Sequence, residues 1–341
     1  MNTKKKLRQI LIFLQRENLN TLALWVLILV AFSAVLVTWL EPDMTLVNAI
    51  WWSIVTLTTV GYGDFSPTTG AGRFIAVIIM FFGIGLLGML SATLATLLIS
   101  RKMKENKGMS RYSFENHIIL CEWNHRSQSI LHEFRADSNT EETPIILIAE
   151  IDEKPEDDSD LFFIKGNVSE ETLEKANLKK AKTVVVIGDD RLEKTARDGK
   201  VVLTTLTIES LCPEVYTVVE LVDEANARHC KRAHADEIIV GSELSSHLIA
   251  SSAINHGISR VVSELLSNQY GNELYSIPIP DKMAGSSFID IFTRMKKEFQ
   301  SIVLGVQKGK AGELIANPPV DYTPANGDYL IVIATERPGK K

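Results

Sequence analysis

The stretch TTVGYGD, residues 58–64, places two glycines one residue apart between two long apolar segments. It contains no histidine, cysteine or lysine, and its single acid, Asp64, follows the glycines. Because the side chains offer little chemistry, the backbone carbonyls are the groups that can act. Glycine reaches left-handed conformations cheaply, so Gly61 and Gly63 would let successive carbonyls face one axis, as they cannot in an ordinary strand.

The segments on either side are long enough to cross a membrane. Residues 21–40 and 74–100 contain no charged side chain, and about 20 apolar residues span a bilayer core as a helix. Residues 44–58 are apolar but too short to span, which indicates a re-entrant helix. Non-helical backbone is tolerated at membrane depth only where protein buries it or where it lines a watery path.

Basic residues flank the pair of spans on both sides and are nearly absent between them. They are Lys4, Lys5, Lys6, Arg8 and Arg16 before the first span, and Arg101, Lys102, Lys104 and Lys107 after the second. We therefore expect a multi-pass protein of the plasma (inner) membrane with both termini in the cytoplasm. Residues 5–18 fit a helix lying on the inner membrane surface, and equally a basic topology signal without defined structure.

The rest of the chain is acidic and strand-rich. Residues 1–110 carry a net charge of +5 and the whole chain −6, so residues 111–341 carry about −11, which argues against a nucleic-acid partner. Strand-like segments alternate with helix-like ones, which predicts a parallel sheet with helices on both faces. The strand-like segments are residues 117–121, 144–150, 161–166, 183–188, 215–221 and 236–241.

With these flanks, TTVGYGD resembles the selectivity filter of the potassium channels. The resemblance implies a homotetramer embedded in lipid, in which carbonyl rings replace the water shell of potassium. It also implies that Trp51 and Trp52 pack around Tyr62. The filter residues would be Thr59, Val60, Gly61, Tyr62 and Gly63. Two spans without an arginine-rich helix imply a pore without a voltage sensor, and a weakly selective cation channel is the alternative.

The soluble part resembles the RCK (regulator of K⁺ conductance) domain. GNVSEETLEKANLKKAKTVVV, residues 166–186, and KRAHADEIIVGSEL, residues 231–244, carry the resemblance, and residues 278–336 resemble the smaller C-terminal lobe. The fold expected is a membrane α-helical pore joined to an α/β Rossmann-like RCK domain with a small α+β lobe. The expected divisions are an N-terminal segment (1–20), pore domain (21–100), linker (101–113), N-lobe (114–242), and helical crossover with C-terminal lobe (243–341).

The family implies a ligand-gated potassium channel. A ring of RCK domains, with or without additional RCK copies, would pull on the inner helices. Gly83, Gly85 and Gly88 lie in the middle of the second span. Two interpretations fit them equally: a hinge that lets the inner helix bend, and close helix packing by small residues.

A nucleotide is one candidate ligand. Nucleotide-binding RCK domains carry G-x-G-x-x-G after the first strand, where the backbone approaches a pyrophosphate. This chain has CEWNHRSQS, residues 121–129, with no glycine. An adenine nucleotide or NAD in that place would meet Glu122, Asn124 and Glu150, the last at the end of the second strand.

Calcium is the candidate that we favour, because hard cations prefer clustered oxygen ligands. Acids follow two strands expected to be neighbours, at the edge where open sheets bind ligands. By position Glu220 matches a calcium-binding acid of calcium-gated members, but Val222 stands where they place a second acid. The candidate calcium ligands are Asp189, Asp190, Glu220, Asp223 and Glu224.

The alternatives of other classes are an NAD-linked, membrane-anchored enzyme and a membrane-anchored sensor without a pore. The chain lacks the glycine fingerprint, and its seven histidines are scattered without a paired nucleophile. The three cysteines, Cys121, Cys212 and Cys230, have no paired spacing, which favours free thiols in a reducing compartment over a zinc site. We therefore expect a channel and no enzyme.

Overall fold

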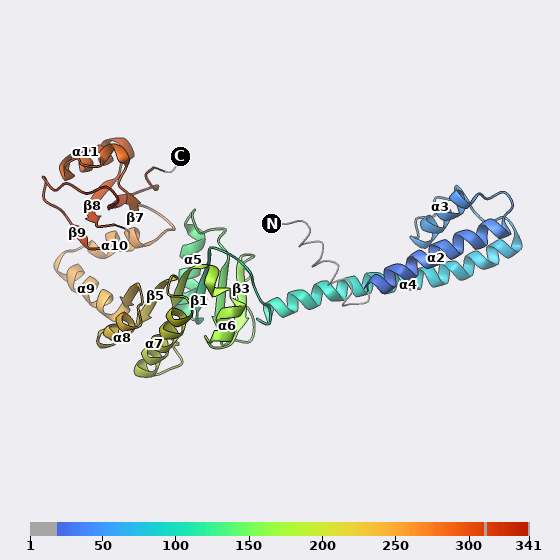
Figure 1. The fold of residues 1–341 in the computed structure, drawn as a ribbon, viewed down its shortest axis with the longest axis horizontal. Helices are drawn as coiled ribbons and strands as arrows, with labels where there is room; N and C mark the ends of the chain where they lie inside the picture. The colour runs from blue at the N-terminus through green and yellow to red at the C-terminus, as the bar shows by residue number, and fades with distance from the viewer. Residues whose placement is uncertain (1–18, 310–311, 340–341) are drawn as a thin grey trace. The chain divides into compact units, whose positions relative to one another are not determined.

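The computed structural model describes residues 19–309 and 312–339, which form two compact units that divide between Lys104 and Glu105 (Figure 1). The predicted surface helix at residues 5–18 lies outside the described residues. Each unit has its own hydrophobic core, so the sharp change in composition along the sequence coincides with a change of unit.

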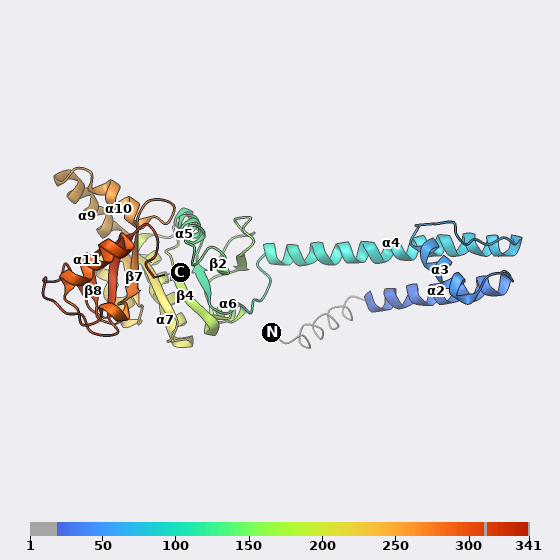
Figure 2. The ribbon, with the colours of Figure 1, turned by 90° about the horizontal axis from the view of Figure 1, so that it is seen from above.

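Three helices make the first unit: α2 (Leu19–Leu40), α3 (Leu46–Leu57) and α4 (Gly70–Asn106). Helices α2 and α4 run side by side in both views (Figures 1 and 2). Small side chains at Ala34, Ala49 and Ala76 form one buried cluster with Trp52, and small residues of this kind let α2 and α3 approach closely. Both long helices are apolar enough to cross a membrane, with a mean hydropathy of 2.5, and α3 is too short.

Helix α4 continues beyond the span. The first part of the linker expected at residues 101–113 is helical, because α4 extends to Asn106. Arginine, lysine, methionine and glutamate are good helix formers, and the sequence RKMKEN offers nothing that breaks the helix. Gly108, with φ +65°, follows the end of the helix, where a left-handed glycine is common.

The second unit begins with a six-stranded parallel sheet of order β3-β2-β1-β4-β5-β6, which confirms the predicted α/β lobe. The strands are β1 (His117–Cys121), β2 (Ile145–Ala149), β3 (Leu161–Lys165), β4 (Ala181–Val186), β5 (Tyr216–Leu221) and β6 (Glu237–Val240). The helical segments are α5 (His125–Ala136), α6 (Glu170–Lys175), η1 (Leu178–Lys180), α7 (Lys194–Leu211), η2 (Glu224–Asn226) and α8 (Ala227–Arg232).

Alternate residues of the central strands feed two cores on opposite faces of this sheet. Ile119 and Cys121 of β1 pack on the face that α6, α7 and α8 cover. Ile118 and Leu120 pack on the face that α5 covers through Leu131. Burial on both faces explains why HIILC is a continuous apolar run. The strand order reverses between β1 and β4, so the carboxyl ends of these strands form the edge where doubly wound sheets bind ligands.

Helices α9 (Gly241–Ile254) and α10 (Ile258–Leu266) lead to a smaller lobe that begins at Glu273, five residues earlier than predicted. Its antiparallel sheet has the order β7-β10-β8-β9, and α11 packs on one face through Ile291 and Met295. The expected α+β lobe is thus confirmed. Its elements are β7 (Glu273–Pro278), η3 (Asp281–Met283), α11 (Phe288–Phe299), β8 (Ile302–Gln307), β9 (Leu314–Ala316) and β10 (Tyr329–Ala334).

Candidate functional site

The glycine stretch has the alternating backbone that the sequence predicts. After α3, left-handed residues occur at Thr59 (φ 61°), Gly61 (φ 59°) and Gly63 (φ 75°), with Val60 and Tyr62 between them. The prediction for the two glycines is confirmed. Thr59 was not foreseen, because a threonine gives no signal for this conformation. Alternation of left-handed and ordinary residues turns successive carbonyls toward the same side.

The two tryptophans of α3, Trp51 and Trp52, make different contacts. The rings of Trp51 and Tyr62 stack with centroids 6.0 Å apart and planes within 4°. The indole nitrogen of Trp51 also donates a hydrogen bond of 2.7 Å to Asp64. Trp52 instead lies in the core between the helices. The predicted packing around Tyr62 is therefore confirmed for Trp51 and wrong for Trp52.

A second contact fixes the loop that follows the glycines. The carboxylate of Glu41, just after α2, accepts hydrogen bonds from Thr68 Oγ1 (2.8 Å), Thr69 N (2.9 Å) and Thr69 Oγ1 (2.7 Å). Gly72 leaves room for that carboxylate, which a Cβ there would overlap. The end of α2 is thereby tied to the start of α4, and the sequence did not point to this role of Glu41.

The three glycines of α4 are not equivalent. A Cβ on Gly83 would overlap the Leu57 side chain at the end of α3, whereas no atom lies within 4 Å of a Cβ on Gly85 or Gly88. Helix α4 is continuous through all three. This geometry supports the packing interpretation for Gly83 and leaves the hinge as a proposal for Gly85 and Gly88.

Replacement of Gly83 by alanine should destabilise the pore unit, because the added methyl group overpacks the buried Leu57, at a cost of about 1–3 kcal/mol. Gly88→Ala is the matched control, since its methyl group meets no neighbour and alanine is the better helix former by roughly 1 kcal/mol. Thermal melting of the purified channel in detergent measures both. Equal melting temperatures for the two variants would refute the packing role of Gly83.

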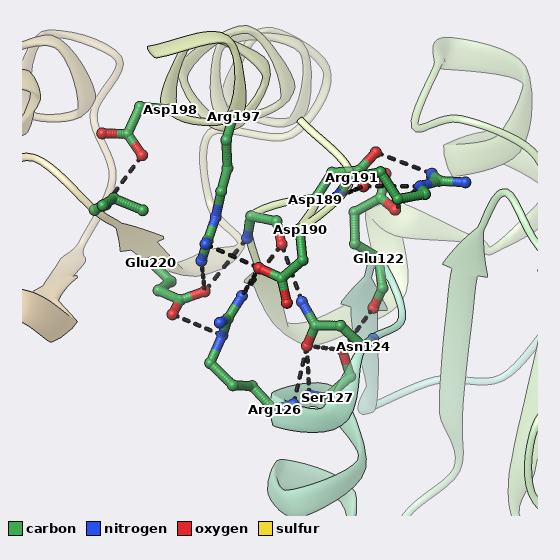
Figure 3. A network of polar contacts seen from close by, with 12 residues as sticks. Glu122, Asn124, Arg126, Ser127, Asp189, Asp190, Arg191, Arg197, Asp198 and Glu220 are labelled. Carbon is green, nitrogen blue, oxygen red and sulfur yellow. Dashed lines mark hydrogen bonds and ion pairs between the residues drawn. The ribbon is translucent and has the colours of Figure 1, made fainter. Parts of the chain in front are cut away.

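In the second unit, three of the five predicted calcium ligands meet arginines. Arg126 from α5 and Arg197 from α7 reach Asp190 and Glu220 from opposite sides (Figure 3). Arg126 lies 2.7 Å from Asp190 and 2.9 Å from Glu220. Arg197 lies 2.8 Å and 3.1 Å from the same two acids.

The network continues toward β1 and β2. Lys200 is ion-paired with Glu122 and, at 3.0 Å, with Asp189, and both of these acids are buried. Arg191 bonds Asp189 at 2.9 Å and lies 3.9 Å from Glu150. Hydrogen bonds from Arg191, and then from Lys200, hold the pKa of Asp189 far below its usual value. Burial would lower the pKa of Lys200, but its bonds to Glu122 and Asp189 raise it.

Four cations thus face five carboxylates across the carboxyl edge of the sheet, so the acids are close to neutralised without a metal ion. The cations are Arg126, Arg191, Arg197 and Lys200, and the acids are Glu122, Glu150, Asp189, Asp190 and Glu220. Sequence reasoning missed the cations. The available signal was Arg191 directly after two aspartates, and Arg197 and Lys200 three residues apart on one helix face.

The residues of the nucleotide alternative also have partners within the chain. Asn124 caps α5, where its Oδ1 accepts hydrogen bonds from Arg126 N (3.0 Å) and Ser127 N (3.1 Å). Its amide nitrogen donates to the Gly188 carbonyl at 3.0 Å. Since backbone N–H groups at a helix N-terminus bind pyrophosphate in nucleotide sites, the cap takes up the donors that a nucleotide would need.

The last two predicted ligands, Asp223 and Glu224, lie apart from this network. They line a cavity of about 570 Å³ at the carboxyl ends of β5 and β6. Its other polar lining residues are Lys194, Thr195, Asn226, Ser242, Glu243 and Ser246. Glu243, in the first turn of α9, was not foreseen, although it lies only two residues after the expected strand 236–241.

Asp198 shapes the wall of this cavity. Its buried carboxylate accepts hydrogen bonds from Val222 N (3.0 Å), Asp223 N (2.9 Å) and Asn226 Nδ2 (2.9 Å). These bonds hold the turn that carries Asp223 and Glu224. Within residues 19–309 and 312–339, no three His, Cys, Asp or Glu side chains converge closely enough to hold a metal by themselves. A cation in the cavity would therefore need carbonyl, hydroxyl or water ligands as well.

Family models match three successive parts of the chain. An ion channel model matches residues 25–100, and a model described as "Calcium-activated potassium channel slowpoke-like RCK domain" matches residues 113–219. Residues 242–341 match a model described as "Castor and Pollux, part of voltage-gated ion channel". The matches cover the pore helices, most of the parallel sheet, and the crossover with the C-terminal lobe.

Two curated relatives cover most of the chain. The chain is 33% identical to the calcium-gated potassium channel TvoK of Thermoplasma volcanium over 85% of its own length and 82% of the relative. It is 26% identical to the putative potassium channel protein YugO of Bacillus subtilis, over 86% of its length and 89% of the relative. Both relatives are named as channels, which favours a channel over the enzyme considered as an alternative.

The second unit is also similar to a solved structure. The gating ring of human SLO3 matches with a TM-score of 0.52 at 16% identity, over 64% of this chain and 44% of the SLO3 chain. This likeness concerns the fold alone. The match to TvoK, the ion channel model and the two apolar helices identify a membrane protein that conducts potassium. The chain belongs to the family of potassium channels that join a two-helix pore to an RCK domain.

Proposed function

We propose that four copies of this chain form a channel whose filter is Thr59, Val60, Gly61, Tyr62 and Gly63, with both termini in the cytoplasm. The support is the alternating backbone of these residues and the exposure of Val60 (55%) and Tyr62 (68%) in a single chain. Unpaired backbone at membrane depth must be covered or line a water-filled path. Copies around an axis satisfy that requirement and stack the carbonyls into rings.

The RCK domains assemble into a ring, either alone or with additional RCK copies. Its support is a set of exposed apolar side chains on the crossover helices α9 and α10. The residues of this set are Leu244, Ile249, Ile254, Val261 and Leu266. Exposed apolar side chains gathered on neighbouring helices are typical of a contact with another protein chain. The outward apolar side chains of α2 face lipid.

Calcium is the ligand that the geometry supports best, and the observation that carries it is the acidic cavity at the end of β5. Three carboxylates, from Asp223, Glu224 and Glu243, face one cation, Lys194, among the lining residues. The relative TvoK is named as calcium-gated. Asp189, Asp190 and Glu220 serve the internal ion-pair network instead, because Arg126, Arg197 and Lys200 already neutralise them.

Binding of calcium would favour one geometry of the ring. A ligand shifts a gate only through its preference for one state, and a hundredfold preference corresponds to roughly 2.7 kcal/mol. The turn held by Asp198 links the cavity to α7 and to β5, so closing the carboxylates around an ion would move the edge of the sheet. The RCK domain would pass this movement to α4.

The double variant Asp223→Asn/Glu224→Gln should raise the half-activating calcium concentration by about tenfold or more, because affinity for calcium follows the number of charged ligands. Single-channel recordings over a calcium series measure it, with potassium selectivity expected to be unchanged. The control Asp321→Asn/Glu336→Gln removes the same charges from exposed positions in the C-terminal lobe.

Adenine nucleotides and NAD are tested in parallel on the parent channel. An unchanged calcium response in the double variant would refute the cavity as the site. A parent channel that does not respond to calcium but responds to a nucleotide would favour the alternative nucleotide site at Glu122, Asn124 and Glu150.

A further inference from the structure

The segment between α4 and β1 lies along the edge strand β3. The Lys165 N–H donates to the Gly108 carbonyl at 3.1 Å, and Met109 forms an antiparallel bridge with Ile164. The Tyr112 N–H donates to the Lys175 carbonyl at 2.9 Å. Because β3 is the last strand of the sheet, its outer backbone groups would otherwise lack partners, and this segment supplies them.

Tyr112 anchors the far end of the segment. Its side chain is buried, and its hydroxyl donates to the Phe163 carbonyl of β3 at 3.2 Å. The ring lies 5.1 Å from that of Phe162 and 5.9 Å from that of Phe114. The residue is therefore held by packing and by a hydrogen bond to the same strand that binds Gly108 and Met109.

The near end joins the helix directly. The carbonyl of Asn106, the last residue of α4, accepts a hydrogen bond of 2.8 Å from the Lys154 N–H in the loop before β3. Gly108 follows with φ +65°, and a Cβ there would overlap the Lys165 backbone nitrogen. Only glycine permits this approach, so the contact is built into the sequence.

We propose that residues 106–112 and β3 form a clamp that stays closed during gating, so that motion of the RCK domain enters α4 at Asn106. This inference rests on the proposed function in that it takes the RCK domain to drive the pore. A free coil of seven residues has an end-to-end distance of roughly 5–6 Å × √7, and it fluctuates. A segment bonded to a strand keeps a fixed length, so a displacement of the strand is not absorbed by stretching of the segment.

The clamp predicts that the position of an insertion matters more than its length. A Gly-Ser insertion between Asn106 and Lys107 separates α4 from the clamp and should raise the half-activating calcium concentration by about tenfold or more, or abolish the response. The same insertion between Glu115 and Asn116, which are both exposed, lies beyond the clamp and should leave the response within about twofold of the parent. Equal effects of the two insertions would refute the clamp, since a simple tether responds to length alone.

A second measurement does not depend on the ligand. Hydrogen exchange of the full-length channel should show protection at the amides of Tyr112 and Lys165, and Gly108→Ala should remove it. Gly285→Ala is the control, because Gly285 also has positive φ (78°) but has open space around it. Fast exchange of both amides in the parent would refute the clamp. Absence of any calcium response in the parent refutes the proposed ligand instead, and exchange then decides the clamp alone.

Discussion

Replacing Gly63 by alanine should abolish potassium current or its selectivity over sodium. Gly63 has φ +75°, and no atom lies within 4 Å of a Cβ placed on it, so the cost comes from the backbone and not from crowding. A left-handed conformation costs an L-residue roughly 1–2 kcal/mol. In the proposed tetramer the cost is repeated four times, which gives roughly 4–8 kcal/mol against the conducting backbone.

Reversal potentials in planar bilayers with potassium on one side and sodium on the other measure this effect. Gly70→Ala is the control, because Gly70 begins α4, has no positive φ and has equally open space around it. It should conduct as the parent does. Normal potassium-selective current through Gly63→Ala would mean that these residues are not the filter.

Replacing Lys200 by methionine should destabilise the RCK unit by about 3–5 kcal/mol, because it leaves buried carboxylates without their cation. Glu122 and Asp189 are 6% exposed each, and both contact the Lys200 ammonium group. Asp189 retains Arg191, so Glu122 would bear most of the loss. Hydrogen exchange of the β1 and β4 amides in the full-length channel measures the change.

Two further variants separate this pair from general effects of charge. Adding Glu122→Gln to Lys200→Met should recover part of the lost stability, because it removes the uncompensated charge. Lys165→Met breaks an exposed pair with Asp152 at 2.8 Å and should cost less than about 1 kcal/mol. If Lys200→Met costs no more than Lys165→Met, the network does not stabilise the fold.

The main features of the membrane part could be predicted from local sequence patterns. A continuous apolar run of 20 residues excludes most alternatives to a spanning helix, and glycines at alternate positions mark a backbone that other residues avoid. Both signals are contained in neighbouring residues. The tasks of Trp51 and Trp52 differ because adjacent residues of a helix face different directions, and the phase of α3 was not evident from its almost wholly apolar sequence. The same ambiguity in α4 hid the contact between Gly83 and Leu57.

The acids of the RCK unit show what local sequence patterns can predict and what they cannot. Their positions after β4 and β5 placed them correctly at one edge of the sheet, because parallel strands bring their carboxyl ends together. Whether each acid is free depends on cations that come from elsewhere, such as Arg126, which is 64 residues before Asp190 in the sequence and 2.7 Å from it in the structure. Coulomb energy depends on the distance between two charges in space, and the number of residues between them does not give that distance.

By itself, then, the sequence determined the two apolar helices, the alternating backbone at Gly61 and Gly63, the doubly wound sheet and the resemblance to the potassium-channel family, since hydropathy, backbone preference and strand pattern each act over a few residues. Only the tertiary structure decided that Asp223 and Glu224 line a cavity while Asp189, Asp190 and Glu220 are paired, and that the segment after α4 lies bonded to β3. These outcomes depend on groups far apart in the chain, whose contacts exist only after the sheet has formed.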